Sequence, residues 1–189
     1  MRTVTYSMST SLDGYITGPD GGIDWGSPDD EVFRFAIDQI RAVGVHLMGR
    51  RLYETMLYWE TVDPRSLDDA EREWTDLWTA LPKVVFSTTL SAVQGRNTRL
   101  ASGSLAEEVA RLRAEPADGE IAIGGGTLAV AAAELGLIDE YRPKVCPVLL
   151  GGGTPFYPRQ GRQVALELVE SRTFTSSRVH YLRYRVARP

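Results

Sequence analysis

Strand-like and helix-like segments alternate along the first 135 residues, and this alternation constrains the fold more than any other feature. Runs rich in β-branched and aromatic residues indicate strands at 2–10, 43–48, 82–87 and 120–123. Helical spacing or helix-capping residues indicate helices at 27–40, 50–56, 67–80, 102–113 and 128–135. Strands that alternate with helices are typical of a parallel sheet, because each crossover returns the chain to the same end. The sequence therefore predicts an α/β fold.

The last third of the chain has a different pattern. Strand-like segments occur at 145–150, 164–174 and 179–186, and no helix separates the last two. Thr175, Ser176 and Ser177 form a plausible hairpin turn between them. We expect an antiparallel hairpin at the edge of the otherwise parallel sheet. No repeat, linker or low-complexity tract interrupts the chain, so residues 1–189 are expected to form one domain.

Composition excludes several function classes. The net charge is −4 with mixed signs along the chain, which argues against a nucleic-acid partner. Apolar runs are too short for a membrane span, and the first strand begins at residue 2, so we expect no leader segment and no membrane partner. The lone Cys146 excludes an internal disulfide and fits a small buried apolar role. With only two histidines, no metal site is expected, and the cytoplasm is the expected location.

Three segments that follow predicted strands suit a phosphate-bearing ligand. Gly49-Arg50-Arg51 places cations at a helix start, Ser87-Thr88-Thr89 offers hydroxyls, and Gly124-Gly125-Gly126-Thr127 permits close backbone approach before a helix. Each alone has a simpler explanation as a solvated helix start or a turn. The glycine triplet also lacks the spacing of a dinucleotide-binding fingerprint or a P-loop. The prediction rests on their joint occurrence at the ends of strands, where ligands bind in open α/β sheets.

Five motifs in order carry a family resemblance. They are residues 11–16 (Ser-Leu-Asp-Gly-Tyr-Ile), 48–54 (Met-Gly-Arg-Arg-Leu-Tyr-Glu), 85–88 (Val-Phe-Ser-Thr), 121–128 (Ile-Ala-Ile-Gly-Gly-Gly-Thr-Leu) and 148–156 (Val-Leu-Leu-Gly-Gly-Gly-Thr-Pro-Phe). With them the chain resembles the dihydrofolate reductase superfamily. It is most similar to the reductase domain of the bifunctional riboflavin deaminase-reductase, the RibD C-terminal family. The resemblance implies a three-layer dihydrofolate reductase-like fold and NADPH as cofactor.

The same resemblance assigns roles to residues of the cofactor site. Gly49, Arg50 and Arg51 would meet the adenosine end, and Ser87 and Thr88 would hold the 2′-phosphate. Ser9 and Ile16 would border the nicotinamide. The pyrophosphate would be wrapped by Gly124, Gly125, Gly126, Thr127 and Leu128. The family also implies a cis peptide bond between Gly124 and Gly125, which would turn the following amides toward the phosphates.

Two acids are candidates for assisting protonation of the substrate. Trp25, Pro28 and Asp30 keep the spacing of the tryptophan, proline and catalytic acid of dihydrofolate reductases, so Asp30 is the first candidate. Asp30 also fits a plain helix start, where acids complement the dipole. Asp13 is the rival, either in the substrate site or as an ordinary turn aspartate. Phe33, Trp25 and Lys144 are further candidate substrate contacts, whereas Trp59, Trp74 and Trp78 are expected to pack in the core.

These observations favour an NADPH-dependent reductase of a small pterin- or pyrimidine-like heterocycle. The alternative is a non-catalytic module that binds a nucleotide or a flavin. The riboflavin-pathway reductases carry an acidic residue where this chain has Gly124, so the substrate stays open. The resemblance also implies a homodimer, for which residues 164–169 and 181–186 are candidate contacts.

Overall fold

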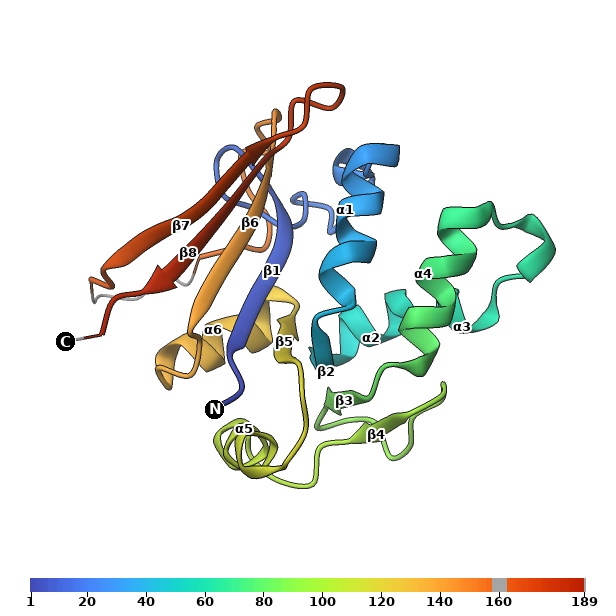
Figure 1. The fold of residues 1–189 in the computed structure, drawn as a ribbon, viewed down its shortest axis with the longest axis vertical. Coiled ribbons are helices and arrows are strands. Elements are labelled where there is room, and N and C mark those ends of the chain that lie inside the picture. Colours follow the sequence, from blue (N-terminus) through green and yellow to red (C-terminus); the bar gives the residue numbers. More distant parts are fainter. Residues whose placement is uncertain (158–162, 189) are drawn as a thin grey trace.

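One mixed sheet organises the molecule (Figure 1). The computed structural model describes residues 1–157 and 163–188. Its eight strands lie in the order β4-β3-β2-β5-β1-β6-β8-β7. They are β1 (Val4–Ser11), β2 (Val43–Gly49), β3 (Lys83–Phe86), β4 (Thr98–Leu100), β5 (Glu120–Gly124), β6 (Glu140–Cys146), β7 (Leu166–Thr173) and β8 (His180–Val186).

The strand directions confirm the predicted mixed sheet. From β4 to β6 all neighbours run parallel, whereas β8 pairs antiparallel with both β6 and β7. The final hairpin turns at 175–177, where the Phe174 amide donates to the Val179 carbonyl at 2.9 Å. This is the dihydrofolate reductase-like three-layer α/β architecture.

Helices connect the parallel strands. They are η1 (Asp24–Gly26), α1 (Asp30–Ile40), α2 (Arg50–Met56), α3 (Tyr58–Thr61), η2 (Pro64–Ser66), α4 (Asp69–Ala80), α5 (Leu105–Ala114) and α6 (Gly126–Glu134), of which η1 and η2 are 3₁₀ helices. Reciprocal capping boxes fix the starts of α4 (Asp68 with Glu71) and α5 (Ser104 with Glu107). Because Ser104 is the N-cap, α5 begins at Leu105 rather than at the predicted residue 102.

The start of α1 differs from the prediction. Ser27 was expected to cap it, but the side chain of Asp29 accepts the Val32 amide at 2.9 Å and is the N-cap. Ser27 instead donates to the Asp24 carbonyl at 3.1 Å and closes η1. A short 3₁₀ turn (Asp24–Gly26) therefore precedes α1, and the helix begins at Asp30 rather than at residue 27.

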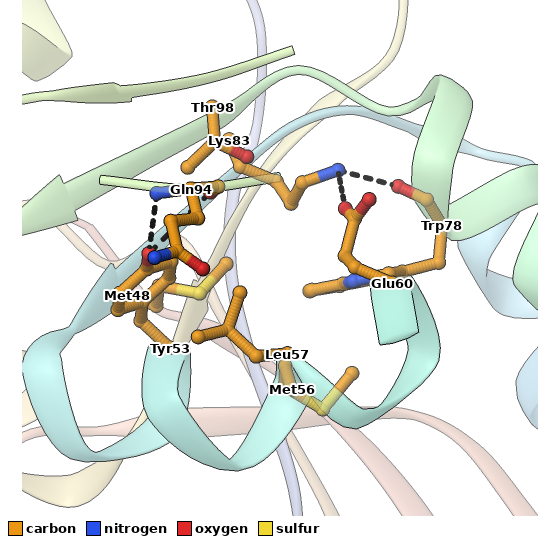
Figure 2. Close-up of a pocket in the computed structure, with 9 residues that line it drawn as sticks. All are labelled: Met48, Tyr53, Met56, Leu57, Glu60, Trp78, Lys83, Gln94 and Thr98. Atoms are coloured by element: carbon orange, nitrogen blue, oxygen red, sulfur yellow. Dashed lines mark hydrogen bonds and ion pairs between the residues drawn. The ribbon is translucent and has the colours of Figure 1, made fainter. Parts of the chain in front are cut away.

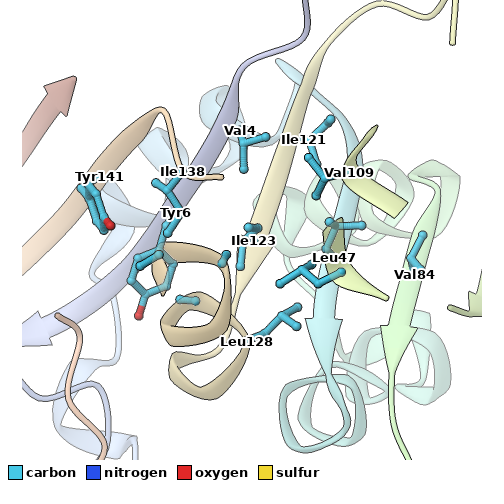
Figure 3. Close-up of a cluster of buried hydrophobic side chains, with 14 of the residues drawn as sticks. Val4, Tyr6, Leu47, Val84, Val109, Ile121, Ile123, Leu128, Ile138 and Tyr141 are labelled. Atoms are coloured by element: carbon cyan, nitrogen blue, oxygen red, sulfur yellow. The ribbon is translucent and has the colours of Figure 1, made fainter. Parts of the chain in front are cut away.

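Helices cover both faces of the sheet, and neighbouring residues of one strand enter different cores. On β2, Leu47 joins the cluster under α5 and α6, whereas Met48 joins the cluster under α2 and α4. Figure 3 shows the first cluster, in which Val109 and Leu128 pack onto β1 and β5. A third cluster places Val32 of α1 on β6 and β8. Among the described residues, no helix is both long and apolar enough to cross a membrane.

Two element bounds were wrong in the sequence prediction. A strand was expected at 145–150, but β6 runs from Glu140 to Cys146 in parallel register with β1. Its charged residues concealed it, because Glu140 and Arg142 neutralise each other inside the fold at 2.7 Å. The helix expected at 128–135 begins two residues earlier, at Gly126.

Candidate functional site

The carboxyl ends of β2, β3 and β5 lie side by side. In the sheet register Met48 is next to Gly124 and Gly49 is next to Phe86. The three segments expected to meet the cofactor, 49–51, 87–88 and 124–128, therefore leave the sheet at one common edge. They come together only through strand pairing, because up to 79 residues separate the first from the last.

The glycine turn after β5 is packed against its neighbours. A Cβ on Gly124 would lie 2.4 Å from Leu52 Cδ2 and 2.5 Å from His46 Cε1. A Cβ on Gly126 would lie 2.7 Å from Thr154 Cγ2 and 3.1 Å from Ile16 Cδ1. A side chain at either position would force these neighbouring side chains to move. The turn therefore packs between the start of α2 and the loop after β1.

The expected cis bond between Gly124 and Gly125 is wrong: every peptide bond in the described part of the chain is trans. The change of direction comes from Gly125, whose φ of +87° only glycine adopts without strain. Gly125 is part-exposed, and a Cβ there would contact only Leu52, at 3.6 Å or more. The outer side of the turn is therefore open to an approaching group.

The N-terminus of α6 and a nearby arginine suit an anion. No side chain caps α6, and Thr127 in its first turn is exposed while Leu128 is buried in the core. Arg50 pairs with Glu54 at 3.8 Å, but the exposed Arg51 side chain has no hydrogen-bond or ion-pair partner among the described residues. First-turn amides and a free guanidinium both attract phosphate.

The hydroxyls after β3 have a structural role already. Ser87 Oγ accepts the amides of Thr89 and Leu90 at 3.1 and 3.0 Å, so it shapes the turn. Thr88 is exposed beside it. Both residues lie at the predicted edge, and the Ser87 hydroxyl hydrogen is still able to donate.

Asp13 holds two loops together. Its carboxylate accepts the amides of Leu150 and Gly151 at 3.1 and 2.8 Å and the Ser11 hydroxyl at 2.6 Å. These hydrogen bonds, with that from Ser11 the strongest, lower the pKa of Asp13. Because its acceptors are engaged, this geometry favours the structural role for Asp13.

The residues predicted around the catalytic acid are not gathered at one point. Asp30 is exposed in the first turn of α1, and its side chain has no hydrogen-bond or ion-pair partner within the described ranges. Phe33 stacks toward Trp59 and Trp74, with ring centroids 6.2 and 5.8 Å apart. Trp25 instead packs against the cluster on β6 and β8. Phe33 therefore packs toward α3 and α4, whereas Asp30 faces solvent.

Lys144, a candidate substrate contact, lies on β6 next to β1. It pairs in register with Ser9, and its ammonium donates to Ser7 Oγ at 3.3 Å. Burial, with repulsion from Arg142, lowers the pKa of Lys144 to about 8. Ser7 was missed by the sequence reasoning, and strand alternation from Ser9 would have found it.

The other lysine, Lys83, is more deeply buried than the part-exposed Lys144 and lines a small cavity on the same sheet face (Figure 2). Lys83 Nζ donates to the Trp78 and Leu81 carbonyls at 2.7 and 3.1 Å and pairs with Glu60 at 3.2 Å. None of the predicted site residues lines this cavity. The side chain of His46, between the cavity region and Gly124, has a pKa lowered by burial to about 4 and is therefore neutral.

Comparison with known proteins places this architecture in a family. The model of the RibD C-terminal domain matches residues 2–180. YyaP, an uncharacterized protein of Bacillus subtilis (strain 168), is 31% identical over 177 residues, which cover 93% of this chain and 90% of YyaP.

Solved structures agree with that match. A putative riboflavin biosynthesis protein from Shewanella sp. PV-4 has a TM-score of 0.76 and 26% identity, covering 98% of this chain and 99% of that one. Dihydrofolate reductase from Enterococcus faecalis, complexed with NADP(H), has a TM-score of 0.63 and 18% identity, covering 98% and 97% of the two chains. The chain belongs to the RibD C-terminal domain family, whose reductase-type fold it shares with dihydrofolate reductase.

Proposed function

We propose that this protein is an NADPH-dependent reductase of a small pterin- or pyrimidine-like heterocycle. The observation that carries the proposal is the convergence of three loops at the carboxyl ends of β2, β3 and β5. That edge combines an open glycine turn, an uncapped helix N-terminus and Arg51, whose side chain has no partner in the described part of the chain. A dinucleotide with several phosphates satisfies all three features together.

The residues present fit such a cofactor. Gly125 and Gly126, with the first turn of α6, would hold the pyrophosphate, and Arg51 with Ser87 and Thr88 would hold the 2′-phosphate. Ser9 and Ile16 would border the nicotinamide, since Ile16 contacts the Gly126 region from the β1 side. When bound, the cofactor supplies a hydride to the substrate. The NADP(H) of the similarly folded Enterococcus faecalis enzyme supports this choice of cofactor.

The substrate class has support from two directions. The Shewanella protein carries a riboflavin-biosynthesis name, which favours a pyrimidine. The Enterococcus protein is a dihydrofolate reductase, which favours a pterin. Both rings are flat heterocycles with a reducible C=N or C=O bond in reach of a hydride donor, so the proposal names the shared class.

Fluorescence titration tests cofactor binding directly. We expect NADPH to bind at least tenfold tighter than NADH, about 1.4 kcal/mol, because Arg51 recognises the 2′-phosphate. Arg51→Ala should weaken NADPH more than NADH. Arg65→Ala is the charge-matched control, because Arg65 pairs with Asp63 in η2, at a distance from the glycine turn. Equal dissociation constants for the two cofactors would contradict the choice of NADPH.

Turnover separates the reductase from the non-catalytic alternative. NADPH consumption is followed at 340 nm (roughly the nicotinamide band) against a panel of pterins and pyrimidines. Consumption with one of them supports the reductase. If the purified protein is yellow with bound flavin and consumes no NADPH, the reductase proposal is wrong and the protein is a flavin-binding module.

We further propose that two copies pair through β7. This edge strand is exposed along its whole length, and it carries Leu166, Leu168 and Val169, with Leu168 56% exposed. An exposed apolar edge strand is a template for pairing with another strand. Sedimentation should give twice the 20.9 kDa chain mass at micromolar concentration. Leu168→Lys should shift it toward monomer, and a wild-type protein that sediments as monomer would refute the pairing.

A further inference from the structure

The side chain of Lys144 lies on a polar strip of the sheet face that α1 covers. Alternate residues of β1 (Ser7, Ser9) and of β6 (Arg142, Lys144) point to this face, because side chains alternate along a strand. The opposite face receives Tyr6, which is buried in the main apolar core. The hydrogen bond from Lys144 Nζ to Ser7 Oγ confirms that the ammonium reaches across toward β1.

This strip continues beyond the point where β5 stops. The pair Tyr6–Ile123 is the last described pair of β1 with β5, so Ser7 lies level with Gly124, one position further. β1 and β6 run on together to the pair Ser11–Cys146. The Ser7 hydroxyl, which Lys144 contacts, therefore lies on the strand next to the glycine turn, and it also donates to the Arg142 carbonyl of β6 at 3.2 Å. A ring bound between the glycine turn and β6 would lie against the Lys144 ammonium.

The electrostatic surroundings leave the Lys144 charge without a counterion. Within residues 1–157 and 163–188, no carboxylate pairs with it. On its own strand the nearby charges are Arg142, which is bound by Glu120 and Glu140, and the thiol of Cys146. Tyr181 lies opposite on β8, and the charged residues of α1 (Asp30, Glu31, Arg34 and Asp38) are all exposed.

An ammonium in this setting gives up a proton more readily than an exposed lysine. Burial and the nearby Arg142 lower the pKa of Lys144 to about 8, so the group is mostly protonated at pH 7 yet close to its midpoint. A donor with a pKa near the working pH is the efficient one in general acid catalysis. Asp30, by contrast, is exposed in the first turn of α1 and is not enclosed by the sheet.

We propose that Lys144 is the proton donor of the reduction, and that the reduced bond is a C=O or C=N whose heteroatom lies against Lys144 Nζ. This rests on the proposed function. A C–H bond of the dihydronicotinamide would break as its hydride formed a C–H bond on the substrate carbon, leaving NADP⁺, and the π pair would move to the heteroatom. That atom takes a proton from Nζ, an N–H bond of lysine breaks, and the neutral amine regains its proton from water. Ser7 positions the amine.

The first experiment needs no substrate. The chain has only two lysines, Lys83 and Lys144, so protein labelled with ¹³C-lysine gives two ε-methylene signals. Lys144→Met assigns them. We expect the Lys144 signal to titrate with a midpoint near pH 8. A midpoint above about 10, the ordinary lysine value, would overturn the proposal.

The second experiment compares Lys144→Met with Lys144→Arg, using NADPH and whichever panel compound the wild type reduces. Loss of a general acid predicts a kcat lower by about 10²–10⁴-fold in both variants. Arg keeps the positive charge but holds its protons too tightly to donate them, so it should preserve KM and not kcat. The wild-type kcat/KM should fall above pH 8. In both variants this decrease should be absent.

The NADPH titration separates the two proposals. Wild-type protein that fails to bind NADPH overturns the proposed function and, with it, the role of Lys144. Wild-type protein that binds NADPH, with a Lys144→Met variant whose kcat is within threefold, overturns only the role of Lys144. A Lys144→Met variant that loses NADPH affinity more than tenfold would make Lys144 a cofactor-binding residue instead, which also overturns the proposal.

Discussion

The two lysines of this chain lie on the same face of the sheet, yet their surroundings are opposite. Lys83 on β3 is 3% exposed, and its ammonium contacts the Trp78 carbonyl and the Glu60 carboxylate (Figure 2). The Leu81 carbonyl is a third acceptor, at 3.1 Å. Lys144 on β6 has one hydroxyl at 3.3 Å. All other cationic side chains are the nineteen arginines and two histidines, so lysine is used only at these two interior positions.

The difference separates a group that holds the fold together from one that is free to react. Burial lowers the pKa of Lys83 and its pairing with Glu60 opposes that change, so its charge is compensated where it lies. Nothing in the described chain provides the same compensation for Lys144. Charges removed from water are costly when unpaired, so we expect the two lysines to contribute to stability with opposite signs.

Lys83→Met tests the structural side of the comparison and has the largest expected effect. The change leaves Glu60, whose side chain is 8% exposed, as an unpaired buried carboxylate. We expect the free energy of unfolding to fall by about 3–5 kcal/mol, measured by urea denaturation. The double variant Lys83→Met with Glu60→Leu removes both charges and should recover most of the loss. If Lys83→Met alone lowers the free energy of unfolding by less than about 1 kcal/mol, Lys83 does not have the structural role that distinguishes it from Lys144.

Lys144→Met should raise the free energy of unfolding, whereas Lys83→Met should lower it. Folding lowers the Lys144 pKa from about 10.4 in the unfolded chain to about 8. Between these values the unfolded chain binds more protons, so stability rises with pH there, and the whole penalty is present below pH 8. At pH 7 the variant should be more stable by about 1–3 kcal/mol. Compared with wild type, its stability should rise less between pH 8 and 10. A destabilised variant would show that Lys144 is structural too.

Gly125→Ala tests whether a cofactor lies beside Lys144. The alanine must adopt a φ of +87°, which costs about 1–2 kcal/mol of stability. NADPH affinity should fall at least tenfold, because the methyl group enters the open side of the turn. Gly136→Ala, at the other end of α6, is the matched control, with a φ of +67° and open space around it. Equal NADPH affinity in the two variants would show that the glycine turn does not contact the cofactor.

Ser7→Ala has the smallest expected effect. The Ser7 hydroxyl accepts a hydrogen bond from the charged form of Lys144, so its loss should lower the Lys144 pKa further, by less than about one unit. The ¹³C titration measures this, and the Lys83 signal in the same sample is the internal control. A raised Lys144 pKa would show that the hydroxyl donates rather than accepts.

Much of the fold was predictable because periodicity is a local property. The alternation of strands and helices predicted the parallel sheet, and the final hairpin followed from two strand-like runs with no helix between them. β6 was misplaced because Glu140 and Arg142 look like surface residues until their partners are known. The three-residue β4 was missed because so short a segment has no readable period.

The sequence by itself determined which loops reach the candidate site, since glycines and hydroxyls after strands mark turns wherever the chain folds. It did not determine which side chain faces the reacting bond. Spacing selected Asp30, yet Asp29 caps the helix and Asp30 is exposed. Lys144 and Ser7 are 137 residues apart and meet only because β1 and β6 pair. Such a contact, and the pKa that burial gives it, depends on distant segments enclosing the same space, and only the tertiary structure decides that.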